Sequence, residues 1–240
     1  MSGRLTEMGN GTVVDRKITT WTVGLVGDYR DGVFGGGLNS FSFSLKFGDG
    51  SIRQDVTAAQ DKATINTIGH FNKQNYEFRR LQKIDENSNL LLSLRGQFSS
   101  RNLMSAEKFA LGGPDGVRAY PTGEALGDEG YIFTAEYRYI IPDFKIWDGD
   151  VTVLGFWDQG HVKEWNNFPS GGAPGCSSVS PVRCSQNYRN ISGFGLGASA
   201  GRDSDYVLRV SAAWRNENEK PQSDPAKRIP RVWAQAIKWF

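Results

Sequence analysis

The sequence has 240 residues, with 28 Lys and Arg against 26 Asp and Glu, so its formal net charge is +2. That length is enough for one large domain or two small ones with a substantial core. The balanced charge argues against a nucleic-acid-binding protein built on a basic face, and no run approaches the ~18 consecutive apolar residues that a membrane helix needs.

Residues 1–16 are predicted to form a polar N-terminal lead-in. They contain no apolar run typical of a signal peptide, so the chain is either cytosolic or a piece of a longer exported protein. From residue 17 onward the dominant hydrophobic period is two. The clearest example is 40–47, where Phe41, Phe43 and Leu45 alternate with serines. No segment of 12 or more residues has a helical period, so the fold is predicted to be all-β.

Nine strands are predicted, and many of them are longer than the usual ~5–6 residues. In chain order they are 17–30, 36–48, 69–83, 88–99, 129–141, 150–163, 190–201, 205–216 and 231–240. Aromatic side chains gather toward the strand ends on the apolar face, as in the girdles of a barrel in lipid.

The connections between these strands alternate in length. Short connections are expected near 31–35, 85–88, 142–149 and 202–204, and long ones at 49–68, 100–128, 164–189 and 217–230. Long loops at one end and short turns at the other are typical of an antiparallel outer-membrane β-barrel. The alternative is a large soluble β-sandwich or jelly roll.

The two cysteines, Cys176 and Cys184, lie in the polar connection 164–189 without a nearby His. A zinc site is therefore not expected. A small disulfide loop would fit an oxidising compartment, and two free thiols are the alternative.

The connection 100–128, which we call the hallmark loop, carries the most specific motif. From Phe109 to Gly130 the sequence resembles the hallmark loop of the two-partner secretion (TpsB-type) outer-membrane transporters, the haemolysin secretion/activation protein family. The matching positions are Gly112, Gly113, Val117, Arg118, Tyr120, Gly123, Gly127 and Asp128. Ala119 departs from this pattern, because the family has Gly there and a positive φ would be costly for Ala.

A second motif supports the resemblance. Phe156, Asp158 and Gly160 resemble the Phe-x-Asp strand motif of the same family. The resemblance implies that the hallmark loop folds back into the lumen and that Arg118 pairs there with Asp158. Alternation would then place Leu154 and Phe156 on the lumen side, together with Asp158.

The resemblance implies a sixteen-stranded barrel whose eleventh and twelfth strands are joined by this loop. Residues 17–240 would then be the C-terminal portion of the barrel. About nine strands cannot close alone, because an odd count brings the first and last strands together in parallel. Phe240 would be the terminal aromatic that the barrel-assembly machinery reads. The lumen side predicted from alternation is polar: Ser40, Ser42, Ser44, Lys46, Ser93, Arg95, Gln97, Thr134, Glu136, Arg138, Arg209, Ser211 and Arg215.

The function implied by the resemblance is translocation of a secreted partner polypeptide, such as a haemolysin or a filamentous adhesin, across the bacterial outer membrane. Expected partners are that polypeptide and outer-membrane lipid; no cofactor, metal or nucleic acid is expected. The alternatives are a barrel-assembly factor of the same superfamily and the barrel of an outer-membrane esterase fusion. Catalysis is not expected: one G-x-S-x-G match surrounds Ser199, but it lies within a predicted strand and lacks the strand–turn–helix context.

Overall fold

The protein forms one large, curved antiparallel sheet in a computed structural model, which describes residues 2–9, 12–168, 186–202, 205–216, 221–224 and 229–239. Ten strands pair in the order β1-β2-β3-β4-β5-β8-β9-β10-β11-β12, so each strand lies beside its neighbour in the meander. Their bounds are β1 Ser2–Gly9, β2 Thr12–Asp31, β3 Gly37–Ile52, β4 Gly69–Lys83, β5 Ser88–Ser99, β8 Glu129–Ile146, β9 Gly149–Lys163, β10 Tyr188–Arg202, β11 Tyr206–Arg215 and β12 Arg231–Lys238.

All nine predicted strands are present, and β1 is an additional one. The additional strand lies within 1–16, the segment expected to be a lead-in. β1 pairs with the first half of β2 from Ser2 opposite Thr19 to Gly9 opposite Thr12. The sequence between them is Asn10-Gly11, a dipeptide strongly favoured in two-residue hairpin turns, and the strand prediction passed over this signal.

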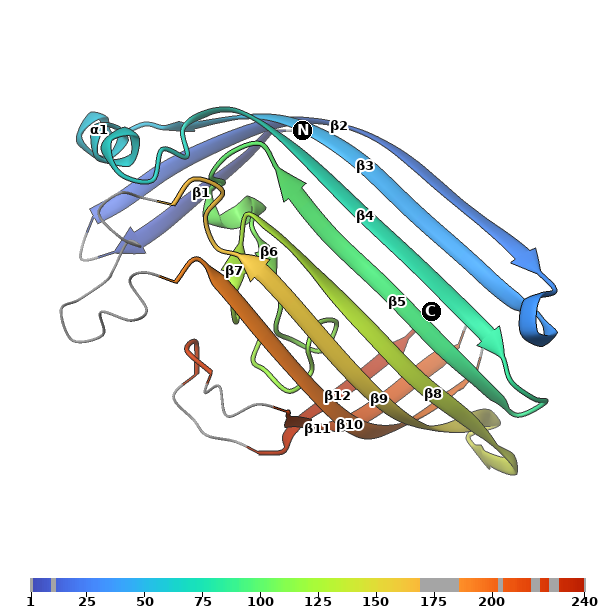
Figure 1. The fold of residues 1–240 in the computed structure, drawn as a ribbon. Helices are drawn as coiled ribbons and strands as arrows, with labels where there is room; N and C mark the ends of the chain where they lie inside the picture. The colour runs from blue at the N-terminus through green and yellow to red at the C-terminus, as the bar shows by residue number, and fades with distance from the viewer. Residues whose placement is uncertain are drawn as a thin grey trace.

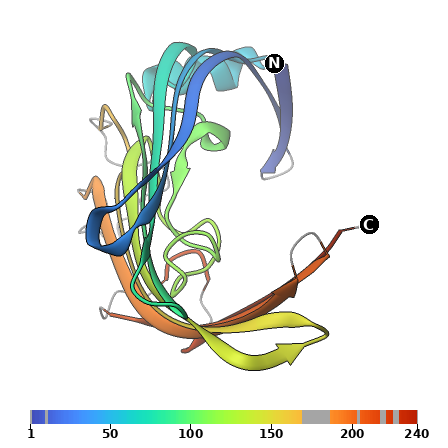
Figure 2. The same ribbon diagram turned by 90° about the vertical axis from the view of Figure 1, so that its right-hand side faces the viewer.

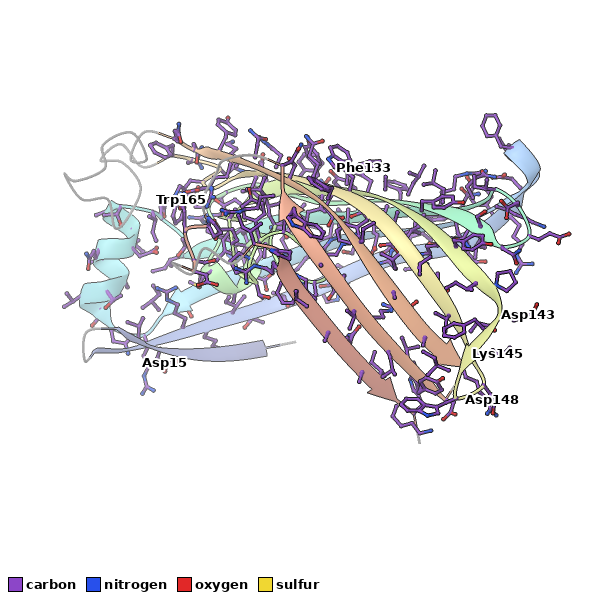
Figure 3. The ribbon with its side chains drawn as sticks, turned by 90° about the horizontal axis from the view of Figure 1, so that it is seen from below. Asp15, Phe133, Asp143, Lys145, Asp148 and Trp165 are labelled. Atoms are coloured by element: carbon purple, nitrogen blue, oxygen red, sulfur yellow. The ribbon has the colours of Figure 1, made fainter. Side chains whose placement is uncertain are left out.

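The connections are gathered at the two ends of the sheet (Figure 1). One end, the long-loop end, holds the connections after β3, β5, β9 and β11. The other, the short-turn end, holds the turns after β2, β4, β8 and β10. In Figure 3, Asp143, Lys145 and Asp148 lie at the short-turn end, whereas Asp15 and Trp165 lie at the long-loop end. The β1–β2 ladder is an exception, because its last pair, Gly9 opposite Thr12, lies at the long-loop end and only two residues separate these partners in the sequence.

Short helical elements occur only in connections of the described chain. The 3-10 helices are η1 Val33–Gly35 and η2 Ser105–Glu107, and α1 spans Asp55–Ala63. The helix α1 was not predicted, because a nine-residue segment is too short for a clear helical period. No helix of the described residues is both long and apolar enough to cross a membrane.

The sheet curves into a trough whose two edges are β1 and β12 (Figure 2). The argument from an odd strand count no longer applies, because ten strands are present, yet these edges do not pair with each other. The convex face exposes large apolar side chains: Trp21, Val23, Leu25, Phe43, Phe78 and Leu196. Water would disfavour such an apolar wall, whereas lipid would not.

Candidate functional site

The hallmark loop lies on the concave side of the sheet, where the green segments in Figures 1 and 2 occupy the inside of the curve. Its two ends are joined by a short ladder of β6 (Phe109–Ala110) with β7 (Leu126–Gly127). Between them, Leu111, Val117 and Tyr120 are fully buried. These three side chains belong to one apolar cluster with wall residues Ile132, Phe156, Val162, Ile191 and Ala213. Burial of this apolar area attaches the loop to the inner wall of β8–β11.

Glycines make the compact path of the loop possible. A Cβ on Gly112 would lie 2.2 Å from the carbonyl oxygen of Pro121, and one on Gly116 would lie 2.1 Å from that of Leu111. Gly113 and Gly123 have φ values of 124° and 80°, which side chains other than Gly rarely adopt. The glycine motif therefore fixes how closely the loop folds on itself.

Two further glycines allow the loop to contact the wall. A Cβ on Gly160 would lie 2.9 Å from a methyl of Leu111, and one on Gly127 would lie 2.6 Å from the Cβ of Val162. Both are positions of the predicted motifs. The small residues provide the space into which loop and wall side chains pack.

Ala119 does not have the strained backbone that its place in the motif suggested. Its φ is not positive, whereas nearby Ala125 has a φ of 52°. Ala119 packs instead against β10, where a Cβ on Gly193 would lie 2.4 Å from the Cβ of Ala119. The expected cost at Ala119 is therefore not incurred, because the backbone there does not require Gly.

The tip of the loop is attached by Arg118, which reaches Asp158 on β9. Nε and Nη2 of Arg118 donate to the two carboxylate oxygens of Asp158 at 2.8 and 2.9 Å, and the backbone N–H of Arg118 adds a third hydrogen bond at 3.1 Å. Thr134 on β8 donates its hydroxyl to the same carboxylate at 3.0 Å. Asp158, only 1% exposed at its side chain, is thus fully paired by a bidentate guanidinium.

Arg118 also has partners beyond Asp158. Its Nη1 donates to Glu136 of β8 at 2.6 Å, and Glu136 accepts from Arg138 at 2.7 Å. The guanidinium carbon lies 3.3 Å from the ring centroid of Phe156, in a cation–π contact. Burial lowers the pKa of Arg118, but the carboxylates of Asp158 and Glu136 outweigh that effect and hold the pKa above its usual value. Arg118 is therefore a permanent cation held between two anions.

The base of the loop is attached by Asp128, which is fully buried. Its carboxylate lies 2.7 Å from Nζ of Lys108 and accepts the backbone N–H groups of Leu103 at 3.0 Å and Asn166 at 2.8 Å. Lys108 lies 3.6 Å from the ring centroid of Trp165. One carboxylate thereby connects the start of the hallmark loop with the connection after β9.

Several residues of the site were not singled out from the sequence. Glu107 and Lys73 pair at 2.7 Å, and Glu107 also pairs at 3.0 Å with Lys46, which alternation had placed on the lumen side. Glu124 pairs with Arg189 of β10, and Trp233 of β12 donates its indole N–H to the carbonyl oxygen of Arg118. Two features of the sequence could have identified these residues. Some are charged residues within the hallmark loop, and the others lie on strands at positions whose alternation places them on the lumen side.

The remaining predicted sites have different outcomes. Cys176, Cys184 and Phe240 lie outside the described residues, so the disulfide and the terminal aromatic stay predictions. Ser199 lies within strand β10, which is not the sharp strand-to-helix turn of a nucleophile elbow. Among the described residues, no group of His, Cys, Asp and Glu is arranged to hold a metal ion.

Comparison with known proteins adds independent findings. Residues 10–178 match the family described as haemolysin secretion/activation protein ShlB/FhaC/HecB. The heme/hemopexin transporter proteins HuxB of two Haemophilus influenzae strains, 86-028NP and ATCC 51907, are 27% and 26% identical over 226 residues. These matches cover 94% of this chain but 37% of each relative, so the chain spans little more than a third of their length.

A solved structure, CdiB from Escherichia coli, is similar in fold, with a TM-score of 0.54 and 13% sequence identity. The match covers 97% of this chain and 47% of CdiB. Nearly the whole described sheet therefore has a counterpart in a longer chain.

Proposed function

Because the chain belongs to the haemolysin secretion/activation protein family, we propose that it supplies the C-terminal part of an outer-membrane barrel through which a partner polypeptide is secreted. The observation that carries this proposal is the hallmark loop on the inner wall, attached at its tip by Arg118, Asp158 and Glu136. A loop inside the sheet's curve occupies space through which a chain would pass. The loop must therefore be displaced during transport.

The inner surface supports passage of an extended chain. A cavity of about 440 Å³ adjoins the tip of the loop, and its polar lining includes Ser93, Thr134, Ser199 and Gln235. Hydroxyl and amide groups offer a passing backbone weak hydrogen bonds that water can replace. A polar lumen therefore lets a polypeptide slide without a deep energy minimum.

The proposed function implies two partners, a secreted polypeptide and outer-membrane lipid. The relatives' name refers to heme and hemopexin transport, and for this chain the cargo proposed is a secreted polypeptide such as a haemolysin or an adhesin. The apolar convex face, with Trp21 and Leu25 strongly exposed, is suited to outer-membrane lipid. Phe240 is proposed to be read by the barrel-assembly machinery.

The proposed role is to let a polypeptide pass through the barrel, and it requires no covalent bond to be made or broken. The relatives found are transporters, and the described residues place Ser199 in a strand without a nucleophile elbow. Nothing in the described chain favours a barrel-assembly factor or an esterase barrel over a secretion transporter. We therefore propose that the chain has no catalytic activity.

The experiment is a secretion assay in cells from which the gene for the whole transporter has been deleted. We expect the partner polypeptide to accumulate in the periplasm of these cells and to return to the medium when the gene is restored. A variant that lacks residues 109–127 of the hallmark loop, compared at a matched outer-membrane level, tests the loop separately from the rest of the barrel. Partner export that is unchanged by deleting the gene would refute the proposal.

A further inference from the structure

A second buried ion pair of the hallmark loop lies apart from Arg118. Oε1 of Glu124 is 2.7 Å from Nη1 of Arg189, which stands near the start of β10 at the long-loop end. The side chains of Glu124 and Arg189 are 0% and 6% exposed. A buried carboxylate is tolerated only where charge and hydrogen bonds match it.

The same carboxylate also binds a segment from another part of the chain. The backbone N–H of Gln222 donates to Glu124 at 3.0 Å, and Ser223 donates its N–H at 2.9 Å and its hydroxyl at 2.7 Å. Gln222 and Ser223 lie in the connection between β11 and β12. Both oxygens of Glu124 are thereby engaged by donors from two separate elements.

The ionisation of Glu124 follows from these contacts. Burial raises the pKa of Glu124, but the hydrogen bonds from Ser223 and Gln222 and the guanidinium of Arg189 outweigh burial, so the pKa lies below its usual value. The group is therefore an anion at neutral pH, and its contacts are charge-assisted.

The same hairpin contacts the loop again near its tip. Nε1 of Trp233, in β12, donates to the carbonyl oxygen of Arg118 at 2.8 Å. Residues 221–224 belong to the connection that precedes β12 in the chain. The last hairpin therefore contacts the hallmark loop at two places, one on each side of residues 119–123.

We propose that Glu124 is a positioning residue that joins the β11–β12 connection to the hallmark loop. We call Glu124, Arg189, Gln222 and Ser223 the Glu124 clasp. The Arg118 pair borders the cavity, whereas the Glu124–Arg189 pair of the clasp is buried and both oxygens of Glu124 are hydrogen-bonded, so the loop tip detaches first and segment 221–224 stays with the loop. The order of release rests on the proposed function, but the clasp itself does not.

The experiment is hydrogen exchange of peptides that cover 221–224, in the whole transporter purified in detergent. Glu124→Ala removes the acceptor of both amides, and we expect exchange there to accelerate about tenfold or more. Glu124→Gln keeps an acceptor oxygen but loses the charge, so we expect a smaller acceleration of the same sign. Because exchange needs no cargo, this result is separate from any result on secretion.

Two control variants make the test specific. Glu129→Gln alters a more exposed carboxylate close to the loop, whose contact with Lys163 spans 4.0 Å, and should leave exchange at 221–224 unchanged. Asp158→Ala frees the tip and should change exchange at 221–224 by less than about twofold. Unchanged exchange in both Glu124 variants would overturn the proposal, as would equal acceleration by Asp158→Ala.

Discussion

The hallmark loop is attached differently at its tip and at its base. At the tip, Arg118 and Glu136 border a cavity of about 440 Å³, so water can reach the ion pair. At the base, Asp128 is fully buried and binds two backbone N–H groups as well as Lys108. An ion pair that water can reach separates at a lower cost than one that is fully buried. The difference indicates that the tip can move while the base stays in place.

The largest effect is expected at the base. Asp128→Ala leaves Lys108 buried without its carboxylate partner and removes the acceptor of two backbone amides, one of them buried, which should cost about 3–5 kcal/mol. We expect little assembled transporter in the outer membrane, measured as heat-modifiable protein on gels. The comparison with the tip fails if Asp128→Ala assembles normally and only export is lost.

The next largest effect concerns transport. Arg118→Ala should leave assembly intact, because loss of the guanidinium opens Asp158 to the neighbouring cavity, where water can solvate the carboxylate and reduce the cost below that of a fully buried pair. Export of the partner should fall strongly at matched outer-membrane levels, since the loop tip is no longer positioned. Asp158→Ala should behave alike, and Arg118→Lys should rescue poorly because an ammonium lacks the bidentate fork.

This prediction is checked by a secretion assay with immunoblots of outer-membrane fractions. A charge-swapped pair, Arg118→Asp with Asp158→Arg, should recover part of the export. Wild-type export by Arg118→Ala at matched levels would show that the ion pair does not position the loop.

A moderate effect is expected where the loop packs on β10. In Gly193→Ala the new Cβ would lie 2.4 Å from the Cβ of Ala119, and overpacking of this kind costs about 1–3 kcal/mol. Adding Ala119→Gly should recover only part of the lost stability, because the new Cβ at position 193 would still lie 2.8 Å from the carbonyl oxygen of Trp214.

The control for this packing is Gly155→Ala on β9, where the nearest atom would be a Leu196 methyl at 3.6 Å. Thermal stability of the purified transporter distinguishes the three variants. A Gly193→Ala transporter as stable as Gly155→Ala would contradict the observed packing of the tip.

The smallest effect is expected from a change of pH, which acts on the Glu124 clasp only below the neutral range. Its lowered pKa means that the stabilisation is fully present above the ordinary value of 4.5 and is lost as pH falls through the lowered value. Exchange protection of 221–224, corrected for the intrinsic rate, should therefore stay constant between about pH 5 and 8 and decrease below that range. Glu124→Gln should show no such decrease, whereas a loss between pH 7 and 5 in the wild type would contradict the assignment.

Much of the fold follows from local patterns. Alternation such as Phe41, Phe43 and Leu45 against serines reports which face of one strand is apolar, and that needs no knowledge of distant residues. The nine predicted strands were accessible in this way, whereas the positions of Arg118 and Asp158 came from the resemblance of their motifs to those of the family. The sequence reading missed β1 because the period-two pattern is weak there, although Asn10-Gly11 is a turn signal.

The all-β class, the alternation of long and short connections and the location of the hallmark loop could be predicted from the sequence alone. The partners of the charged residues emerged from the three-dimensional structure: Glu136 beside Arg118, Arg189 and Ser223 around Glu124, and Trp233 on the carbonyl of Arg118. The physical reason is that a side-chain period encodes the face of a strand, whereas an ion pair depends on strand register and on where a loop turns back. Those positions are set by packing between segments far apart in the chain, such as Leu111 and Val117 against Gly160.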